Sequence, residues 1–261
     1  MNRLDRTLAL LQINKSKALV AYLVAGDPDL KTTVELMHGF VDSGVDIIEL
    51  GIPFSDPIAE GITIQNAHDR ALNKGTTFSK ALQLLKEFRS TDNDTPVIFM
   101  GYSNTFMANQ KVLESPQSKN IDGLIIVDLP GEISHKDLGI NNDKLHSITL
   151  MSPTTNATRK KAICRNASGF IYYINIRGVT GDSILDFKEM ASNINGIRKS
   201  SNLPIFSGFG IKTKEDAMQA SISADGVVIG SHLVQMIEKC SHQNNYKKIY
   251  NYLRAMAKAI K

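Results

Sequence analysis

Eight short apolar segments recur along the chain, most of them followed by a stretch with helical spacing. They are residues 18–26, 46–53, 96–102, 123–130, 147–153, 170–176, 204–210 and 226–231. Several are apolar almost without alternation, which is typical of parallel strands covered on both faces. Their starts are mostly 22 to 34 residues apart, the length of one strand plus one helix. The pattern therefore predicts repeated strand–helix units.

Helical spacing is clearest in residues 29–44, 77–90 and 213–225. In the first of these, Val34, Met37, Phe40 and Val41 fall on one face, and Gly44 follows as a helix end. Residues 1–17 predict a further amphipathic helix with Leu4, Leu8 and Leu11 on one face. The long interval from residue 53 to 96 has room for a loop insertion as well as a helix.

Eight such units in one chain predict an α/β protein, a (β/α)8 TIM barrel with an N-terminal helix. The open alternative, a doubly wound sheet, usually carries a Gly-rich dinucleotide turn after its first strand. The first strand here ends in AGDPDL, which lacks that turn. No linker, repeat or low-complexity tract divides the sequence, so we expect a single domain over residues 1–261.

Composition narrows the class of protein. The 42% hydrophobic and 21% charged residues are usual for a soluble globular chain. No run of 18 apolar residues and no secretory core is present, so we expect a cytoplasmic protein without a membrane segment. The net charge of +4 could suit an anionic ligand but is modest. Lys and Arg are scattered, with no basic run interleaved with aromatic residues, which argues against nucleic-acid binding. The two cysteines, Cys164 and Cys240, predict neither a disulfide framework nor a metal site.

A barrel carries its active site where the strands end, and phosphate often binds after the seventh and eighth strands. The seventh segment ends at Gly208 and Gly210, and the eighth at Gly230 and Ser231, before a short helical stretch. Glycines let a backbone approach an anion, and a helix N-terminus offers free N–H groups. These residues predict a phosphate site, although ordinary glycine turns would give the same letters. Residues 177–182 are long and polar enough for a lid, or for a common loop.

Two carboxylates complete the predicted site. Glu49 interrupts an apolar strand near its C-terminal end, where burial would raise its pKa toward a value useful for acid–base chemistry. A buried salt bridge is the structural alternative, but the sequence offers no obvious partner. Glu60 follows in the next loop and becomes a second proton-transfer group if that loop folds back over the barrel mouth. Otherwise it is a solvated loop acid.

Several motifs, in order along nearly the whole chain, resemble those of the tryptophan synthase alpha chain family. They are residues 25–28 (AGDP), 49–57 (ELGIPFSDP), 63–66 (TIQN), 178–181 (GVTG), 208–211 (GFGI) and 230–231 (GS). The resemblance implies a single (β/α)8 barrel. It also implies a lyase of tryptophan biosynthesis that cleaves indole-3-glycerol phosphate to indole and glyceraldehyde 3-phosphate by a retro-aldol reaction.

The same resemblance implies roles for individual residues. Glu49 would be the principal acid–base group, and Glu60 would accept a hydrogen bond from the indole nitrogen. Thr180 would help to orient Glu60. The remaining implied contacts are with the phosphate (Gly181, Gly210, Gly230 and Ser231) and with the indole (Tyr22, Tyr102 and Tyr172). Each tyrosine is equally compatible with simple core packing.

The resemblance also implies a partner. A beta subunit carrying pyridoxal phosphate would receive the indole in an alpha2-beta2 heterotetramer, whereas this chain itself would need no cofactor. The loop from Pro53 to Pro57 would form the contact, with Asp56 in an ion pair across it. An Asp before a proline is also a common turn former, so Asp56 has a second explanation.

The chain departs from the family in one loop. Residues 59–62 read Ala-Glu-Gly-Ile where the family has Ala-Asp-Gly-Pro. Glu60 is one methylene longer than aspartate, and a misplacement of about 1 Å costs roughly 100-fold in rate. The alternative is therefore a weakly active or inactive alpha-type barrel that mainly binds and activates the beta subunit. Another phosphate-binding barrel, such as indole-glycerol-phosphate synthase or a phosphoribosyl isomerase, is disfavoured by the ELGIPFSDP motif.

Overall fold

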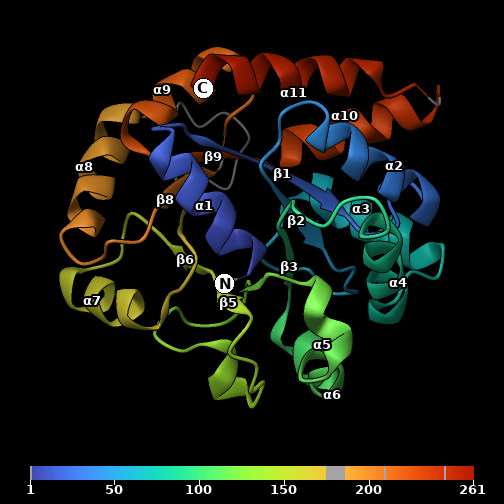
Figure 1. Cartoon of the computed structure of the whole chain (residues 1–261), viewed down its shortest axis with the longest axis horizontal. Coiled ribbons are helices and arrows are strands. Elements are labelled where there is room, and N and C mark those ends of the chain that lie inside the picture. Colours follow the sequence, from blue (N-terminus) through green and yellow to red (C-terminus); the bar gives the residue numbers. More distant parts are fainter. Residues whose placement is uncertain (1, 175–185, 209, 244) are drawn as a thin grey trace.

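A computed structural model describes residues 2–174, 186–208, 210–243 and 245–261. Its strands form one sheet in which every pairing is parallel, in the order β5-β4-β3-β2-β1-β9-β8-β7-β6 (Figure 1). The strands are β1 (Ala18–Val24), β2 (Ile47–Gly51), β3 (Val97–Gly101), β4 (Gly123–Ile126), β5 (His146–Ser147), β6 (Thr149–Met151), β7 (Ile171–Ile174), β8 (Ile205–Gly208) and β9 (Gly226–Ile229).

The ninth strand arises from a break within one predicted strand. Residues 147–153 were expected as a single unit, but β5 pairs with β4 whereas β6 pairs with β7. At the break, the Ile148 N–H still donates to the Leu124 carbonyl on the β4 side, at 3.0 Å. The segment thus joins the two ends of the sheet, and the predicted eight-unit barrel is confirmed.

Helices surround the sheet in the alternation that the sequence predicts (Figure 1). They are α1 (Arg3–Ile13), α2 (Leu30–Val41), α3 (Ile62–Asn73), α4 (Phe78–Phe88), α5 (Ser103–Ala108), α6 (Gln110–Leu113), α7 (Ala157–Asn166), α8 (Phe187–Arg198), α9 (Lys214–Ser223), α10 (Ser231–Ser241) and α11 (Lys247–Ile260). Two 3-10 helices, η1 (Pro116–Asn120) and η2 (His135–Leu138), complete the set. The long interval before β3 holds α3 and α4, which agrees with the expected extra length. Within the described ranges, every helix is too short or too polar to cross a lipid bilayer.

Alternating side chains of each strand point to two different cores. The larger core lies between the sheet and the helices and includes Leu19, Leu23 and Phe40. The other lies inside the barrel, where one cluster includes Val20 and Ile98 and a smaller one includes Tyr22 and Val24. Because all seven residues of β1 are buried, their sequence shows no polar alternation.

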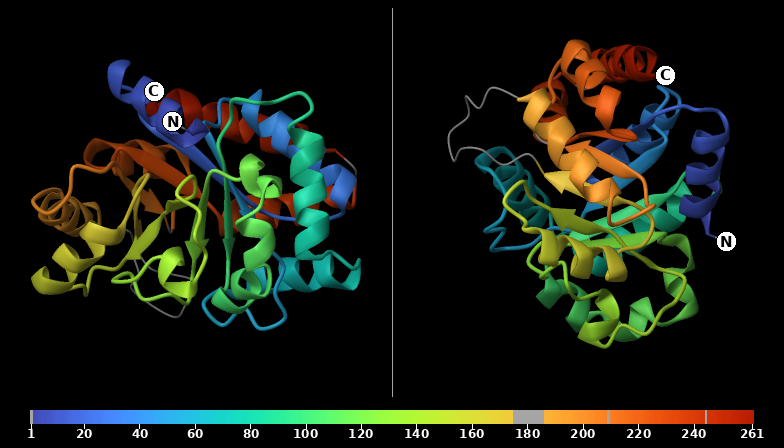
Figure 2. Two further views of the ribbon diagram at one scale, coloured as in Figure 1. Left: turned by 60° about the horizontal axis from the view of Figure 1, so that its bottom comes forward. Right: turned by 90° about the vertical axis from the view of Figure 1, so that its left-hand side faces the viewer.

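Helix α1 closes the N-terminal end of the barrel. The Asn2 side chain accepts from the Asp5 N–H in a capping box and also donates to the Asp122 carbonyl, just before β4, at 2.9 Å. Leu4 is fully buried in the barrel core, and Leu8 packs against the same core. In the right-hand view of Figure 2, α1 (blue) and α3 (teal) lie on opposite sides of the barrel. The opposite end is therefore left for a site.

Candidate active site

A pocket at the C-terminal ends of the strands collects most of the predicted site residues. It is lined by both carboxylates, two of the three tyrosines and three of the phosphate residues: Glu49, Glu60, Tyr22, Tyr172, Gly210, Gly230 and Ser231. Ile64, Met100, Val228 and Ile211 supply apolar surface between them. Thr180 and Gly181 lie outside the described residues.

Glu49 reaches the pocket from β2, where it is in register with Tyr22 on β1 and Ile98 on β3. Glu49 is 1% exposed, and its Oε1 atom has no hydrogen-bond partner among the described residues. The salt-bridge alternative for this carboxyl therefore finds no support in the described part of the chain. Burial, with a smaller contribution from the charge of Glu60, raises the pKa of Glu49 to about 8.

Glu60 lies in the loop between β2 and α3, which folds back over the barrel mouth. Its backbone N–H donates to the Pro57 carbonyl at 3.0 Å, and its carbonyl accepts from Gln65 Nε2 at 2.7 Å. Burial raises the pKa of Glu60 to about 7. Two carboxyl groups that lie in one pocket, with pKa values near neutrality, are suited to acid–base catalysis at physiological pH.

Tyr102 supports this loop rather than lining the pocket. Its hydroxyl accepts a hydrogen bond from the Ala59 N–H at 3.1 Å, and its ring stacks on Phe54 with 4.9 Å between centroids. Burial raises the pKa of Tyr102 to about 12, so the hydroxyl stays neutral. The residue predicted to contact the indole thus holds the backbone next to Glu60.

Tyr22 and Tyr172 share one packing arrangement. Each ring lies over a glycine of the neighbouring strand. A Cβ atom at Gly51 would be 2.3 Å from the Tyr22 hydroxyl oxygen, and one at Gly208 would be 2.4 Å from the Tyr172 hydroxyl oxygen, so only glycine leaves room for these rings. Burial and the nearby Glu49 and Glu60 charges raise the pKa of both hydroxyls well above 10. Both tyrosines therefore remain neutral hydrogen-bond donors beside the carboxylates.

The other end of the pocket is built for an anion. Gly230 is the N-cap of α10 and Ser231 is its first residue, so free N–H groups and the positive end of the helix dipole face the same space. Gly210 has a φ of +78°, a conformation that favours glycine. A Cβ atom added at Gly230 would meet nothing within 4 Å, so the pocket is open there.

Two basic residues at this end were missed by the sequence analysis. Lys212 and His232 line the pocket directly after the two glycine motifs. The Tyr252 hydroxyl on α11 donates to the Lys212 carbonyl at 3.0 Å, and its ring lies 5.3 Å from that of His232. Burial and the charges of Lys212 and Lys239 lower the pKa of His232. Their positions directly after the glycine motifs could have identified both residues as members of the phosphate site.

His68 was also missed. It lies on the buried face of α3 with Ile64, Ala67 and Ala71, where the sequence pattern indicates only core packing. Its Nδ1 atom accepts a hydrogen bond from the Phe54 N–H at 3.0 Å, which ties α3 to the loop that carries Glu60. No feature of a single sequence separates this histidine from a structural one.

The predicted interface residues lie in the same loop but differ in exposure. Pro53 is buried, whereas Asp56 is exposed and makes no ion pair with another described residue. Ile58 and Ile62 are 75% and 69% exposed beside it. Exposed apolar side chains next to a free carboxylate are compatible with a partner surface at this point.

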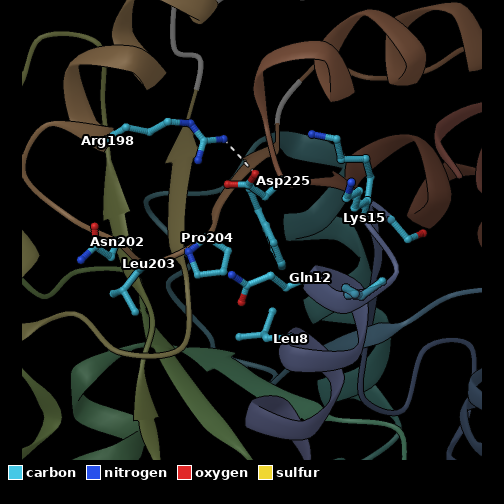
Figure 3. A pocket seen from close by; sticks show the side chains of 12 residues that line it. Leu8, Gln12, Lys15, Arg198, Asn202, Leu203, Pro204 and Asp225 are labelled. Atoms are coloured by element: carbon cyan, nitrogen blue, oxygen red, sulfur yellow. Dashed lines mark hydrogen bonds and ion pairs between the residues drawn. The ribbon is translucent and has the colours of Figure 1, made fainter.

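A larger cavity, about 380 Å³ against about 80 Å³ for the pocket, lies at the other end of the barrel between α1 and the start of β8 (Figure 3). Arg198 donates to Asp225 at 2.8 Å, and Lys17 donates to the Ala224 carbonyl at 2.7 Å. The charged side chains that line this cavity are thus largely engaged in structural contacts. The N-terminal face of a barrel usually serves stability. Among the described residues no group of three or more His, Cys, Asp and Glu side chains is placed to hold a metal ion.

Comparisons with known proteins agree with this geometry. The sequence model described as tryptophan synthase alpha chain matches residues 8–261. The tryptophan synthase alpha chain of Azoarcus sp. (strain BH72) is 40% identical over 100% of this chain and 97% of its own length. The structure of subunit alpha from Legionella pneumophila str. Paris is 39% identical, covers 100% of this chain and 98% of that one, and superposes with a TM-score of 0.91.

A more distant structure, tryptophan synthase from M. tuberculosis in an aminoacrylate-bound form, is 25% identical over 100% of both chains with a TM-score of 0.86. The similarity in sequence and in fold extends over nearly the whole length of the chain. The chain belongs to the tryptophan synthase alpha chain family.

Proposed function

We propose that this chain, as a single barrel domain, cleaves indole-3-glycerol phosphate into indole and glyceraldehyde 3-phosphate by a retro-aldol reaction. The observation that best supports this is one pocket with a buried and a half-buried carboxyl group at one end and a glycine-flanked helix N-terminus at the other. A substrate that carries an indole at one end and a phosphate at the other matches this division of chemistry.

Glu49 carries out both proton transfers, and Glu60 stabilises the charge that forms between them. Glu49, with a pKa of about 8, is largely protonated near pH 7 and gives its proton to indole C3. The ring nitrogen becomes positive, and the Glu60 carboxylate accepts its N–H in a hydrogen bond. The Glu49 carboxylate then takes the glycerol hydroxyl proton as the carbon–carbon bond breaks. The electron pair of that bond restores the indole ring, and Glu49 ends protonated as it began.

The phosphate would be bound by backbone and side-chain donors around α10. Gly210 and Gly230 contribute N–H groups, and Ser231 contributes its hydroxyl. Lys212 and His232 add donors at the same end of the pocket. Gly181 is proposed as a further donor and Thr180 as an orienting group for Glu60, both on the basis of the family motif alone. Because both proton transfers balance within the chain, we propose that it needs no cofactor.

The indole would lie between the two ends. Tyr22 and Tyr172 flank Glu49, and Met100 and Ile64 provide apolar contact. Tyr102 acts in this proposal through the loop that it anchors. Desolvation of this region strengthens the hydrogen bond between Glu60 and the ring nitrogen.

We propose that a beta subunit carrying pyridoxal phosphate binds beside the loop from Pro53 to Ile62, in an alpha2-beta2 heterotetramer in the cytoplasm. The exposed Asp56 carboxylate and the exposed Ile58 and Ile62 side chains support a contact at this loop. The loop also carries Glu60, so a partner there would influence the position of a proposed catalytic group.

The alternative, a weakly active or inactive alpha chain that mainly activates its partner, rested on Glu60. No observation favours it, because Glu60 lines the pocket and its loop is anchored by Tyr102 and Gln65. The longer side chain is accommodated with its carboxyl group within electrostatic reach of Glu49.

Indole release by the purified chain, with and without a beta subunit, tests the proposal. Wild type should release indole, and Glu49→Gln and Glu60→Gln should each lower kcat by about 10²-fold or more, because each removes a proton-transfer or charge-stabilising group. Glu60→Asp should retain activity within about 10-fold. A silent wild type that Glu60→Asp revives would establish the partner-binding alternative instead.

A further inference from the structure

His68 is a buried histidine whose two ring nitrogens have different partners. It is 2% exposed on α3, and burial lowers its pKa to about 4, so the imidazole is neutral across the physiological range. A neutral imidazole has one donor nitrogen and one acceptor nitrogen. The hydrogen-bond partners decide which nitrogen has which role.

The loop backbone fixes the tautomer. The Phe54 N–H can only donate, and it lies 3.0 Å from His68 Nδ1, so Nδ1 must be the acceptor. The ring hydrogen is then on Nε2, which lies 3.5 Å from the Tyr22 hydroxyl oxygen. His68 therefore donates to Tyr22, in a long hydrogen bond, and the hydroxyl hydrogen of Tyr22 cannot point back at His68.

The hydroxyl hydrogen of Tyr22 is therefore left for an acceptor elsewhere in the pocket. Tyr22 is in register with Glu49 on the neighbouring strand, and its oxygen lies over Gly51, two residues further along the Glu49 strand. Both Glu49 and Glu60 are close enough for their charges to raise the pKa of Tyr22. Glu49 Oε1 is buried and has no hydrogen-bond partner among the described residues, so a bond from the Tyr22 hydroxyl would form only as the carboxyl ionises.

We propose that His68 is a positioning residue, which holds the Tyr22 hydroxyl as a hydrogen-bond donor to Glu49 when that carboxyl is ionised between its two proton transfers. The inference rests on the proposed function, because ionised Glu49 is formed in that reaction. No proton leaves Tyr22. Its hydroxyl stabilises the carboxylate by a charge-assisted hydrogen bond. The other titratable groups that face this part of the pocket are Glu60, Tyr172, Lys212 and His232.

Two substitutions separate the two nitrogens of His68. His68→Asn places an amide near the Nδ1 position, so it keeps an acceptor for the Phe54 N–H but loses the donor to Tyr22. His68→Gln places its amide near the Nε2 position, so it keeps the donor and loses the acceptor. Tyr22→Phe removes the hydroxyl itself, and the double variant His68→Asn with Tyr22→Phe tests whether the two residues act through one another.

The readout is the pKa of Glu49, measured by 13C NMR titration of labelled glutamate carboxyls and assigned with Glu49→Gln. His68→Asn and Tyr22→Phe should each raise this pKa by about 0.5 to 1 unit, because a donor to the ionised form is lost. His68→Gln should raise it by less, and the double variant should match Tyr22→Phe alone. The kcat for indole release should fall by about 3- to 10-fold in His68→Asn with KM changed less.

A different ranking would overturn the proposal. If His68→Gln has the larger effect, or His68→Asn leaves the Glu49 titration at its wild-type value, His68 only anchors the loop at Phe54. Thermal melts identify any variant that fails to fold. If His68→Asn does, a wild-type Glu49 titration in Tyr22→Phe still overturns the proposal, because the hydroxyl is then no donor to Glu49. The titration does not need turnover, so a wild type that releases no indole would refute the proposed function while the effect of His68 on Glu49 is still measured.

Discussion

Burial of the Glu49 carboxyl links the stability of the barrel to pH. The pKa of this group rises from 4.5 to about 8 on folding, so the folded state favours its protonated form. Its contribution to stability is therefore fully present below pH 4.5, and it is lost as the pH rises toward 8. Above that value the folded protein holds a desolvated charge that the unfolded chain would leave in water.

Glu49→Gln should remove this pH dependence, since glutamine is a neutral isostere of the protonated acid. At pH 9 the free energy of unfolding should exceed that of wild type by about 2 to 4 kcal/mol, and at pH 5 the two proteins should be close. Thermal or urea unfolding at both pH values measures the difference. Glu87→Gln, on the exposed face of α4, is the control and should shift neither value by more than about 0.5 kcal/mol. A Glu49→Gln effect of equal size at pH 5 and 9 would contradict the linkage.

The functional role of a single residue could be predicted where the residue departs from the local sequence pattern. Glu49 was recognised because a charge interrupts an apolar strand, and the pocket contains it. His68 breaks no rule, since a histidine on the apolar face of a helix is commonly structural. Tyr102 was expected in the pocket, but it supports the loop, because its orientation depends on the contacts of Phe54 and Ala59. Such contacts are tertiary and leave no trace in the local pattern.

The N-terminus of α10 is both a helix end and the proposed anion-binding site. Gly230 is the N-cap of this helix, with φ −112° and ψ −102°. A Cβ atom would enter open space inside the pocket. The absence of a side chain thus leaves room for an anion to approach the backbone at this helix end.

Gly230→Ala should separate binding from folding. The free energy of unfolding should change by less than about 1 kcal/mol, the usual range for a helix N-cap. The affinity for inorganic phosphate or glycerol 3-phosphate should fall by about 10-fold or more, because the methyl group occupies the anion position. Calorimetric titration and thermal melts give both quantities. Gly61→Ala, at the N-cap of α3 with equally open space, is the stability control. Unchanged phosphate affinity in Gly230→Ala would place the anion elsewhere.

The start of α3 departs from the family in a way that concerns stability. Ile62 is the first residue of the helix, where the family has proline, and Gly61 before it has φ −73° and ψ 161°, which a following proline tolerates. No described carbonyl accepts the Ile62 N–H. Ile62→Pro should therefore raise the free energy of unfolding by about 0.4 to 1 kcal/mol and the Tm by roughly 1 to 3 °C.

The matched control lies four residues earlier. Ile58 is similarly exposed, but its N–H donates to the Asp56 carbonyl at 2.9 Å. Ile58→Pro removes this donor and should lower the Tm, measured in the same melts. An Ile62→Pro variant that melts below wild type would mean that the backbone at residue 62 does not have the conformation that proline needs.

At the scale of the whole molecule, the eight-unit barrel could be predicted because parallel strands buried on both faces give nearly continuous apolar runs at regular spacing. The break at Ile148 could not, since it reflects how one strand meets two neighbours at the closure of the barrel. The short helices after β3 and the 3-10 helix after β4 also lack strong helical spacing. Closure and local irregularity depend on the assembled sheet, whereas the repeat depends on burial alone.

We expect the N-terminal end of the barrel to contribute to stability and the C-terminal end to catalysis, and substitutions in α1 test this expectation. Leu4 is fully buried against the barrel core at the end opposite the pocket, whereas Leu10 on the same helix is 59% exposed. Leu4→Ala should lower the free energy of unfolding by about 2 to 5 kcal/mol through lost burial and the remaining cavity. Leu10→Ala should change it by less than about 0.5 kcal/mol.

Both variants should release indole at 25 °C with wild-type kcat and KM, because neither side chain reaches the pocket at the C-terminal ends of the strands. Urea unfolding and steady-state kinetics on the same preparations measure the two effects. A Leu4→Ala protein that remains folded yet loses kcat by 10-fold would contradict this expectation. It would show that the inner core, which runs from Leu4 to Tyr172, transmits changes along the barrel axis. Equal kinetics in a less stable protein would instead confine the chemistry to the pocket and leave α1 a purely stabilising role.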